Sequence, residues 1–222
     1  MYLHLLGAAL VTAGALAMPS STAQTIPLST FDSVELRNGG KVILRHGATP
    51  QVTFLRGSRD YTSVTSQGGS LVINKCKSRC PRGYELSVEI VTPHIVRVSI
   101  TDGGTIESRG NFAQSEIAAS VTSGGTIDIR TIRVDRVNAS VSEGGRIFTR
   151  PQASMFATVM NGGNITYWGN AQVQSSIDGG GVVTKGDADE ADKPLSELIS
   201  FQESPPPAPP VPAVPPIPST RN

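Results

Sequence analysis

Residues 119–127 read Ala-Ser-Val-Thr-Ser-Gly-Gly-Thr-Ile, and residues 139–147 repeat the pattern as Ala-Ser-Val-Ser-Glu-Gly-Gly-Arg-Ile. A third copy, Ala-Thr-Val-Met-Asn-Gly-Gly-Asn-Ile, occupies residues 157–165. The part of each copy before the glycines is small, polar and β-branched, which predicts a strand with two different faces. The glycine pair predicts a tight turn with positive φ. We expect the valine before each turn and the isoleucine after it to point inward.

The motif Gly-Gly-x followed by Ile, Val or Leu recurs seven times along the chain. The first two copies, Gly39-Gly40 and Gly68-Gly69, are widely spaced, whereas the later ones follow one another at 18–21 residues. The turn glycines predicted for these regular copies are Gly103, Gly104, Gly124, Gly125, Gly144, Gly145, Gly162, Gly163, Gly180 and Gly181. A unit of about 20 residues made of short strands cannot bury its apolar face alone, but stacked units can.

These repeats predict an all-β fold, and specifically a parallel β-solenoid that resembles a β-helix, with rungs about 4.8 Å apart. An antiparallel sandwich or barrel is the alternative, since hairpins also use glycine-rich turns. Residues 31–100 alternate less regularly between apolar and polar, and we expect them to form an N-terminal β cap. The 23 Gly and 16 Pro residues, with only 17% charged residues, also argue against a helical bundle.

The two ends of the chain differ in composition from the repeats. An apolar run followed by small residues predicts a signal peptide over residues 1–23, with a buried first strand as the alternative. The run is too short to span a bilayer, so we expect no transmembrane segment in the mature chain. The repeat domain is then expected over 24–186, and an acidic segment with a short helix over 187–204. A Pro-rich, disordered tail is expected over 205–222.

Several stretches together resemble one bacterial family, the head GIN domain of auto-transporter adhesins. They are Phe31-Asp32-Ser33-Val34-Glu35-Leu36, Val42-Ile43-Leu44, Leu71-Val72-Ile73 and the Ser-Gly-Gly-Thr-Ile and Glu-Gly-Gly-Arg-Ile turns. The resemblance covers residues 31–186, although the turns have Gly where the family has a second Ser. It implies an exported, all-β, solenoid-like domain of the bacterial envelope, and it carries over no catalytic residues.

If the repeats stack, equivalent positions form columns along the sheets. The position three residues after each turn isoleucine should lie on the outer face, where arginines and an indole could bind an anionic glycan or a protein partner. This candidate ligand stripe consists of Arg109, Arg130, Arg150, Trp168 and, beside Gly186, Lys185. The alternative is structural, with the arginines paired to Glu107 and Asp128 and the tryptophan packed at a strand end.

The residue before each glycine pair forms a second column. Its members are Asp102, Ser123, Glu143, Asn161 and Gly179. We interpret this column as a hydrogen-bonded ladder of turns. The alternatives are a cation site or a catalytic pair of Asp102 and Glu143, with Arg130, in a polysaccharide-degrading enzyme.

Cys76 and Cys80 are the only cysteines of the chain. In an exported protein this spacing predicts a small-loop disulfide, which would staple a basic loop containing Lys75, Lys77, Arg79 and Arg82. A zinc or redox site is the alternative, but the chain shows no matching ligands. Phosphate-loop, nucleophile-elbow and His/Glu metal motifs are missing from the sequence, so we expect no cofactor and no metal site.

These features predict an exported, non-enzymatic protein of the bacterial envelope, located in the periplasm or on the cell surface. It would act as an adhesin or binding module for an anionic glycan or a protein partner. The net charge of +1 provides no general attraction to nucleic acid, so no nucleic-acid partner is expected. A structural protein that self-associates is one alternative, and a polysaccharide-degrading β-helix enzyme is another. The sequence leaves the oligomeric state open.

Overall fold

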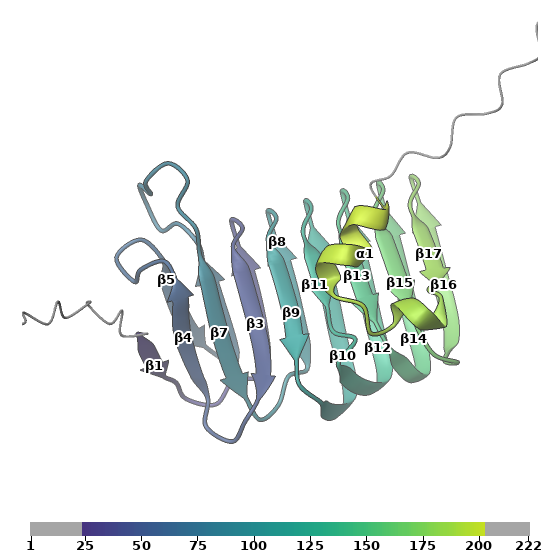
Figure 1. Cartoon of the computed structure of the whole chain (residues 1–222), viewed down its shortest axis with the longest axis horizontal. Coiled ribbons are helices and arrows are strands. Elements are labelled where there is room, and N and C mark those ends of the chain that lie inside the picture. The colour runs from purple at the N-terminus through teal and green to yellow at the C-terminus, as the bar shows by residue number, and fades with distance from the viewer. Residues whose placement is uncertain (1–23, 203–222) are drawn as a thin grey trace, which may run out of the picture.

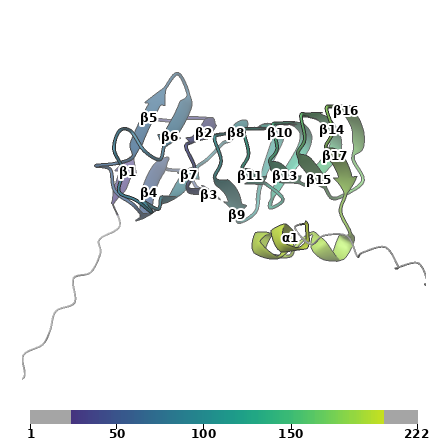
Figure 2. The same ribbon diagram turned by 90° about the horizontal axis from the view of Figure 1, so that it is seen from above.

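The computed structural model describes residues 24–202, so the predicted signal peptide (1–23) and Pro-rich tail (205–222) lie outside the described residues. The strands form two large sheets that face each other across one hydrophobic core (Figures 1 and 2). Most neighbouring strands are parallel, in contrast to the antiparallel alternative. The all-β prediction is therefore confirmed. Over residues 24–202 no helix has the length and apolar character needed to cross a membrane.

The spatial order of the strands in each sheet differs from their order in the chain. From one edge to the other, the first sheet contains nine strands: β1 (Thr25–Pro27), β4 (Gln51–Arg56), β7 (Ser87–Thr92), β3 (Lys41–His46), β9 (Thr105–Arg109), β11 (Thr126–Asp128), β13 (Arg146–Thr149), β15 (Asn164–Tyr167) and β17 (Val182–Lys185). The second contains eight: β16 (Gln172–Asp178), β14 (Pro151–Met160), β12 (Ile132–Ser142), β10 (Phe112–Thr122), β8 (Arg97–Thr101), β2 (Ser33–Arg37), β6 (Ser70–Asn74) and β5 (Ser63–Gln67).

Each regular repeat contributes one strand to each sheet, and equivalent residues of successive repeats pair with one another. Ile127 pairs with Ile106 on one side and Ile147 on the other, in the nine-stranded sheet. Val121 pairs with Val141 in the eight-stranded sheet. All of these side chains are buried in the core between the sheets. The prediction that the valine and the isoleucine point inward is thus confirmed.

The glycine turns make close stacking of the repeats possible. In the turn after β10, Ser123, Gly124 and Gly125 have φ values of 57°, 84° and 106°, so three successive residues have positive φ. A Cβ on Gly125 would approach Ile100 Cγ2 to 2.8 Å and the Gly104 carbonyl oxygen to 3.1 Å, whereas a Cβ on Gly124 would meet nothing within 4 Å. The first glycine is therefore required by conformation, and the second by conformation and by contact with the neighbouring turn.

The first two glycine pairs play different parts. Gly39-Gly40 joins β2 to β3 and is stacked on the later turns, since a Cβ on Gly104 would lie 2.9 Å from the Gly40 carbonyl oxygen. Gly68-Gly69 instead forms the tight turn of the antiparallel β5–β6 hairpin. The expected N-terminal β cap therefore does not include residues 33–46, whose β2–turn–β3 unit pairs in register with β8 and β9. Its spatial neighbour, β8–β9, begins about 50 residues after β3 ends.

The two ends of the paired sheets are built differently. At the N-terminal end, the antiparallel strands β1, β4 and β5 flank the parallel ones (Figure 1). At the other end, β16 and β17 are the last strands of their sheets, and most of their side chains are exposed. After β17 the chain continues through the 3₁₀ helix η1 (Ala188–Glu190) and α1 (Leu195–Gln202), which lie outside the nine-stranded sheet (Figure 2).

Candidate functional site

A second, small hydrophobic cluster lies outside the main core, where residues 187–202, the C-terminal segment, cover the nine-stranded sheet. Phe148 and Trp168 come from the sheet, and Ala191 and Leu198 come from the segment. All four are buried, and the Trp168 side chain is only 2% exposed. The indole Nε1 of Trp168 also donates a hydrogen bond of 2.9 Å to the Asp187 carbonyl oxygen.

Arg130 fastens the segment to the sheet and uses all five of its donors to do so. Its Nε and one terminal nitrogen donate to the two carboxylate oxygens of Asp128, at 2.9 and 2.7 Å. The remaining three donors reach backbone carbonyl oxygens of the segment at 3.0–3.2 Å. These carbonyls belong to Glu190, Ala191 and Lys193. Buried at 8% exposure and packed beside the Trp168 ring, this guanidinium has a structural role.

The strand register shows which residues share the predicted column. Asp128 pairs with Phe148, and Phe148 pairs with Thr166. Each residue of the column lies two positions after one of these three, so Arg130, Arg150 and Trp168 are equivalent. Lys185, however, pairs with Tyr167, which places Gly186 rather than Lys185 beside Trp168. A Cβ on Gly186 would meet the indole ring of Trp168. The inclusion of Lys185 in the stripe was therefore wrong, because the register leaves room only for glycine there.

At Arg130 and Trp168 the stripe is not open to solvent, in agreement with the structural alternative in which the arginine pairs with Asp128 and the tryptophan is packed. Strand alternation does place them on the outer face, but the C-terminal segment covers that face. Arg109 and Arg150 remain exposed. Arg109 Nε lies 3.1 Å from a Glu107 carboxylate oxygen, and an Arg150 terminal nitrogen lies 3.4 Å from one of Asp192, whose side chain is 90% exposed.

Glu107 is the most strongly engaged carboxylate near the uncovered part of this face. It accepts from Lys41 Nζ at 2.7 Å as well as from Arg109. Burial tends to raise the pKa of Glu107, but the hydrogen bonds and charges of Lys41 and Arg109 outweigh burial and hold it below its ordinary value of 4.5. The carboxylate is thus charged at neutral pH and neutralises part of the local positive charge.

Two adjoining hollows lie at the chain bends at residues 109–111, 130–133 and 150–152, and the C-terminal segment lines the first of them. The larger, of about 320 Å³, contains charges of both signs. The other, of about 300 Å³, is lined by Asn111, Arg130, Thr131, Arg133, Arg150 and Gln152, and contains no acidic residue. We call Asn111, Arg133, Arg150 and Gln152 the anion subsite. Within residues 24–202 Arg133 has no ion-pair partner, so its charge is available to a ligand.

Of the residues in the anion subsite, the sequence pattern identified Arg150 but not Arg133, Asn111 or Gln152. The missed residues come from the bends opposite the glycine turns, where the repeats differ in length and no motif recurs. Between Val134 and Arg136 the pairing of β12 with β14 also shifts, so sequence spacing does not align these bends. Only strand alternation could have located Arg133 from the sequence: it follows the inward-facing Ile132 and must therefore point outward.

The column of residues before the glycines behaves as a set of turn positions. Asn38, Asp102, Ser123, Glu143 and Asn161 all have φ between 53° and 62°. Ser123 Oγ donates a 2.9 Å hydrogen bond to a Glu143 carboxylate oxygen, which agrees with the predicted ladder. Among the described residues no group of three His, Cys, Asp or Glu side chains is arranged to hold a metal ion.

One comparison with known proteins identifies a family. The model of the putative auto-transporter adhesin, head GIN domain, matches residues 30–166. No curated protein matches the sequence. A putative lipid binding protein from Parabacteroides distasonis is 12% identical with a TM-score of 0.40, and 74% of this chain and 96% of that one are covered. A putative adhesin from Bacteroides fragilis is 18% identical with a TM-score of 0.37, covering 75% and 97%. Because the family model spans more than half of the sequence, the chain belongs to the head GIN domain family of putative auto-transporter adhesins.

Proposed function

We propose that the protein is an exported, non-enzymatic β-solenoid of the bacterial envelope that binds an acidic glycan at the anion subsite. The observation that carries this proposal is the acid-free hollow in which Arg133, without an ion pair among the described residues, lies beside Arg150. Arginine forks suit carboxylates and sulfates, and the Asn111 and Gln152 amides supply hydrogen bonds to sugar hydroxyls. Its volume of about 300 Å³ is at the lower limit for ligand pockets and suits one sugar unit of a longer chain.

The proposed compartment is the periplasm or the cell surface. The predicted signal peptide, the family's name and the disulfide between Cys76 and Cys80 support export. Mass spectrometry of the mature N-terminus after cell fractionation tests this part directly. A mature protein that begins at Gln24 in an envelope fraction is expected, and an uncleaved cytosolic chain would contradict it.

The binding proposal is tested by calorimetric titration with an acidic oligosaccharide such as oligogalacturonate. Arg133→Gln should weaken binding about tenfold, as expected for loss of a charged hydrogen bond worth about 1.5 kcal/mol. Arg136→Gln is the matched control, because Arg136 lies on the same strand but pairs with Glu116 at 3.3 Å outside the hollow. Equal affinities of the two variants would contradict this placement of the site.

The enzymatic alternative has less support from the turn column. Asp102 and Glu143 lie two repeats apart, with the Ser123 turn between them, and Glu143 is hydrogen bonded to Ser123. The pair would then be about 9–10 Å apart, at the upper limit for an inverting glycosidase. An unchanged rate of polysaccharide cleavage in a double Asp102→Ala and Glu143→Ala variant would eliminate this pair as catalytic.

Self-association is a second candidate function, favoured by the open end of the sheets. No described strand pairs with the outer edges of β16 and β17, where Ile177 is 48% and Val182 is 50% exposed. Such an edge readily accepts another strand. A second copy related by twofold symmetry could add its own end strands there. Sedimentation should then show a dimer that Ile177→Lys dissociates, whereas a concentration-independent monomer would exclude this candidate.

A further inference from the structure

A cluster of basic residues at the N-terminal end of the sheets is separate from the anion subsite. It lies on two loops, residues 57–62 after β4 and residues 75–86 between β6 and β7. We define the basic tip as Arg59, Lys75, Lys77, Arg79 and Arg82. Both loops are at the end opposite α1 (Figure 1). Residues 57–86 carry five cations against two acids, a net charge of +3, whereas the whole chain carries only +1.

The positive charges of the basic tip are not neutralised within the protein. None of the five cations takes part in an ion pair with any residue of the range 24–202. The nearby Glu85 is already paired with Arg56, at 2.6 Å. Asp60 is therefore the one remaining acid of these loops. Arg59, Lys77, Arg79 and Arg82 are exposed, and only Lys75 is half-buried.

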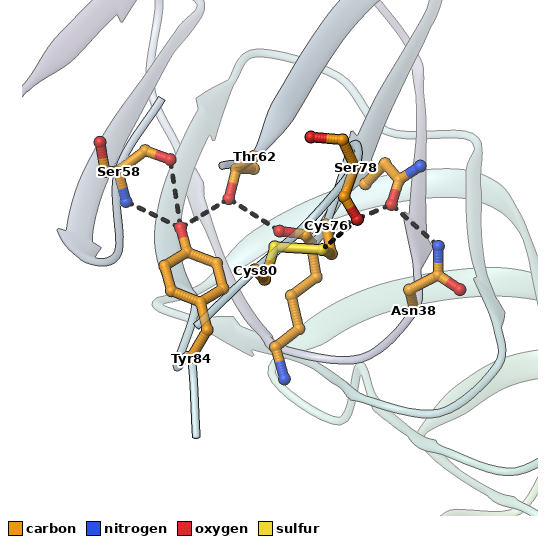
Figure 3. The surroundings of a disulfide bond; sticks show 9 residues. Asn38, Ser58, Thr62, Cys76, Ser78, Cys80 and Tyr84 are labelled. Carbon is orange, nitrogen blue, oxygen red and sulfur yellow. Dashed lines mark hydrogen bonds between the residues drawn. A yellow bond between two sulfur atoms is a disulfide. The ribbon is translucent and has the colours of Figure 1, made fainter. Parts of the chain in front are cut away.

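The two loops are held together by a network of bonds (Figure 3). The predicted disulfide is confirmed: Cys76 is bonded to Cys80, four positions further along the chain. The Tyr84 hydroxyl accepts a 2.8 Å hydrogen bond from the Ser58 amide and lies 2.8 Å from the Thr62 hydroxyl. Thr62 Oγ1 in turn donates to the Lys75 carbonyl oxygen at 3.1 Å. These bonds reduce the number of conformations available to the loops, so the cations are presented together before a ligand arrives.

Further hydrogen bonds join the loop of residues 57–62 directly to the loop of residues 75–86. The Lys77 backbone amide donates to the Tyr61 carbonyl oxygen at 2.9 Å, and Lys77 Nζ donates to the Arg59 carbonyl oxygen at 3.1 Å. The Tyr61 ring also packs edge-on against Tyr84, with 5.3 Å between the ring centroids. The cations of both loops therefore belong to one braced surface.

Two exposed apolar side chains accompany these cations. Leu55, at the end of β4, is 49% exposed, and Tyr61, within the first loop, is 37% exposed. A single small anion would gain little from exposed cations, since each pair is screened by water. An extended anionic surface gains from all of them at once, and leucine and tyrosine side chains can enter the headgroup region of a bilayer.

We propose that the basic tip docks the protein on an anionic lipid bilayer, with the phosphates of the lipid headgroups facing the five cations and with Leu55 and Tyr61 at the headgroup level. This function is independent of glycan binding at the anion subsite. The anion subsite lies several repeats away, so both could be occupied at the same time. The cations are held together by the bonded loops, they have no ion-pair partners among the described residues, and apolar side chains lie nearby. Together these features favour a lipid surface over a soluble polyanion.

The experiment is co-sedimentation of the full chain with vesicles of phosphatidylcholine, with and without phosphatidylglycerol. Binding is expected only to the vesicles with phosphatidylglycerol, and it should fall as salt is added. Because each cation near such a surface contributes about fivefold to partitioning, Arg79→Gln with Arg82→Gln should reduce partitioning about 30-fold. Leu55→Ser should reduce it by about tenfold or less, since one apolar side chain is removed.

The matched control is Arg97→Gln with Arg146→Gln, two cations of the repeats that also lack ion pairs among the described residues. It changes net charge equally and should keep binding within about twofold of the unmodified protein. Equal losses in both double variants would overturn the proposal, as would equal binding to pure phosphatidylcholine. Displacement by glycerol phosphate at matched phosphate concentration would indicate a phosphate pocket instead. Retention on an acidic polysaccharide without vesicle binding would also overturn it.

Discussion

The outer faces of the two sheets come from the same repeats, yet within residues 24–202 one face is partly covered and no helix covers the other. On the nine-stranded sheet, Phe148 and Trp168 are buried under the C-terminal segment. On the eight-stranded sheet, Phe156 lies beside a hollow lined mostly by small side chains and is 52% exposed. An outward-facing aromatic residue is therefore not sufficient for another segment of the chain to pack over it. The difference arises because the chain leaves β17, in the nine-stranded sheet, and folds back onto that sheet (Figure 2).

The two phenylalanines provide the most direct way to test this comparison. Phe148→Ala should lower the free energy of unfolding by about 3–5 kcal/mol, because it leaves a cavity under the segment. Phe156→Ala should change it by no more than about 0.5 kcal/mol, as for most surface substitutions. Urea unfolding of both variants measures the difference. Similar values for the two would show that the cover adds no stability.

Arg130 tests the polar part of the same cover. Arg130→Ala leaves the Asp128 carboxylate buried without its partner and removes three hydrogen bonds to the segment, so a loss of about 3–5 kcal/mol is expected. Arg109→Ala, in the equivalent position of the uncovered repeat, breaks only a surface pair and should cost less than about 1 kcal/mol. The same unfolding assay measures both variants. If Arg130→Ala cost as little as Arg109→Ala, Arg130 would not hold the C-terminal segment on the sheet.

The turn between the two sheets is common to both faces and should be insensitive to the cover. Gly125→Ala combines a positive φ with contacts to Ile100 and Gly104, and should cost about 2–5 kcal/mol. Gly124→Ala has open space around it and should cost about 1–2 kcal/mol for its conformation alone. Thermal unfolding compares the two. If the order were reversed, contact between stacked turns would not be the reason for the second glycine.

Trp168 is the only tryptophan and therefore reports on the cover without a label. Leu198→Asp places a charge in the small cluster and should release the segment, shifting the indole emission to longer wavelength while the β-sheet circular dichroism stays unchanged. Ser196→Asp, at an exposed position of α1, should leave the emission unshifted. A blue, unshifted spectrum for Leu198→Asp would mean that the segment does not shield Trp168.

Acid pH should produce the smallest effect. The pKa of Glu107 is lowered in the folded protein, so its charged form stabilises the fold above pH 4.5, and this contribution disappears as the pH falls below that value. Glu107 and its partners Lys41 and Arg109 are partly exposed, so we expect their ion pairs to contribute less than about 1 kcal/mol to the free energy of unfolding. Glu107→Gln should make unfolding less pH-dependent between pH 3 and 5 by about that amount. Identical pH profiles for the variant and the original protein would contradict this.

Local sequence patterns were sufficient for the strands, the turns and the disulfide. Apolar alternation located the inward-facing residues, and the glycine pairs located the turns, because both signals act within a few residues. The ligand-binding role considered for Trp168 and Arg130 did not hold, because the exposure of these side chains depends on a segment more than 18 residues further along the chain. The anion subsite was missed because Asn111, Arg133 and Gln152 come together only when bends of unequal length are stacked.

The sequence by itself determined that the chain is all-β, that its repeats pair in register, and that glycine is required at each turn. These properties follow from side-chain alternation and from backbone conformation, which are local. Only the tertiary structure decided which outer face is covered, that Gly186 rather than Lys185 lies beside Trp168, and that residues 33–46 are a repeat separated from its neighbour by an insertion. Those outcomes depend on where distant segments meet, and the free energy of such contacts is not encoded in any single stretch of residues.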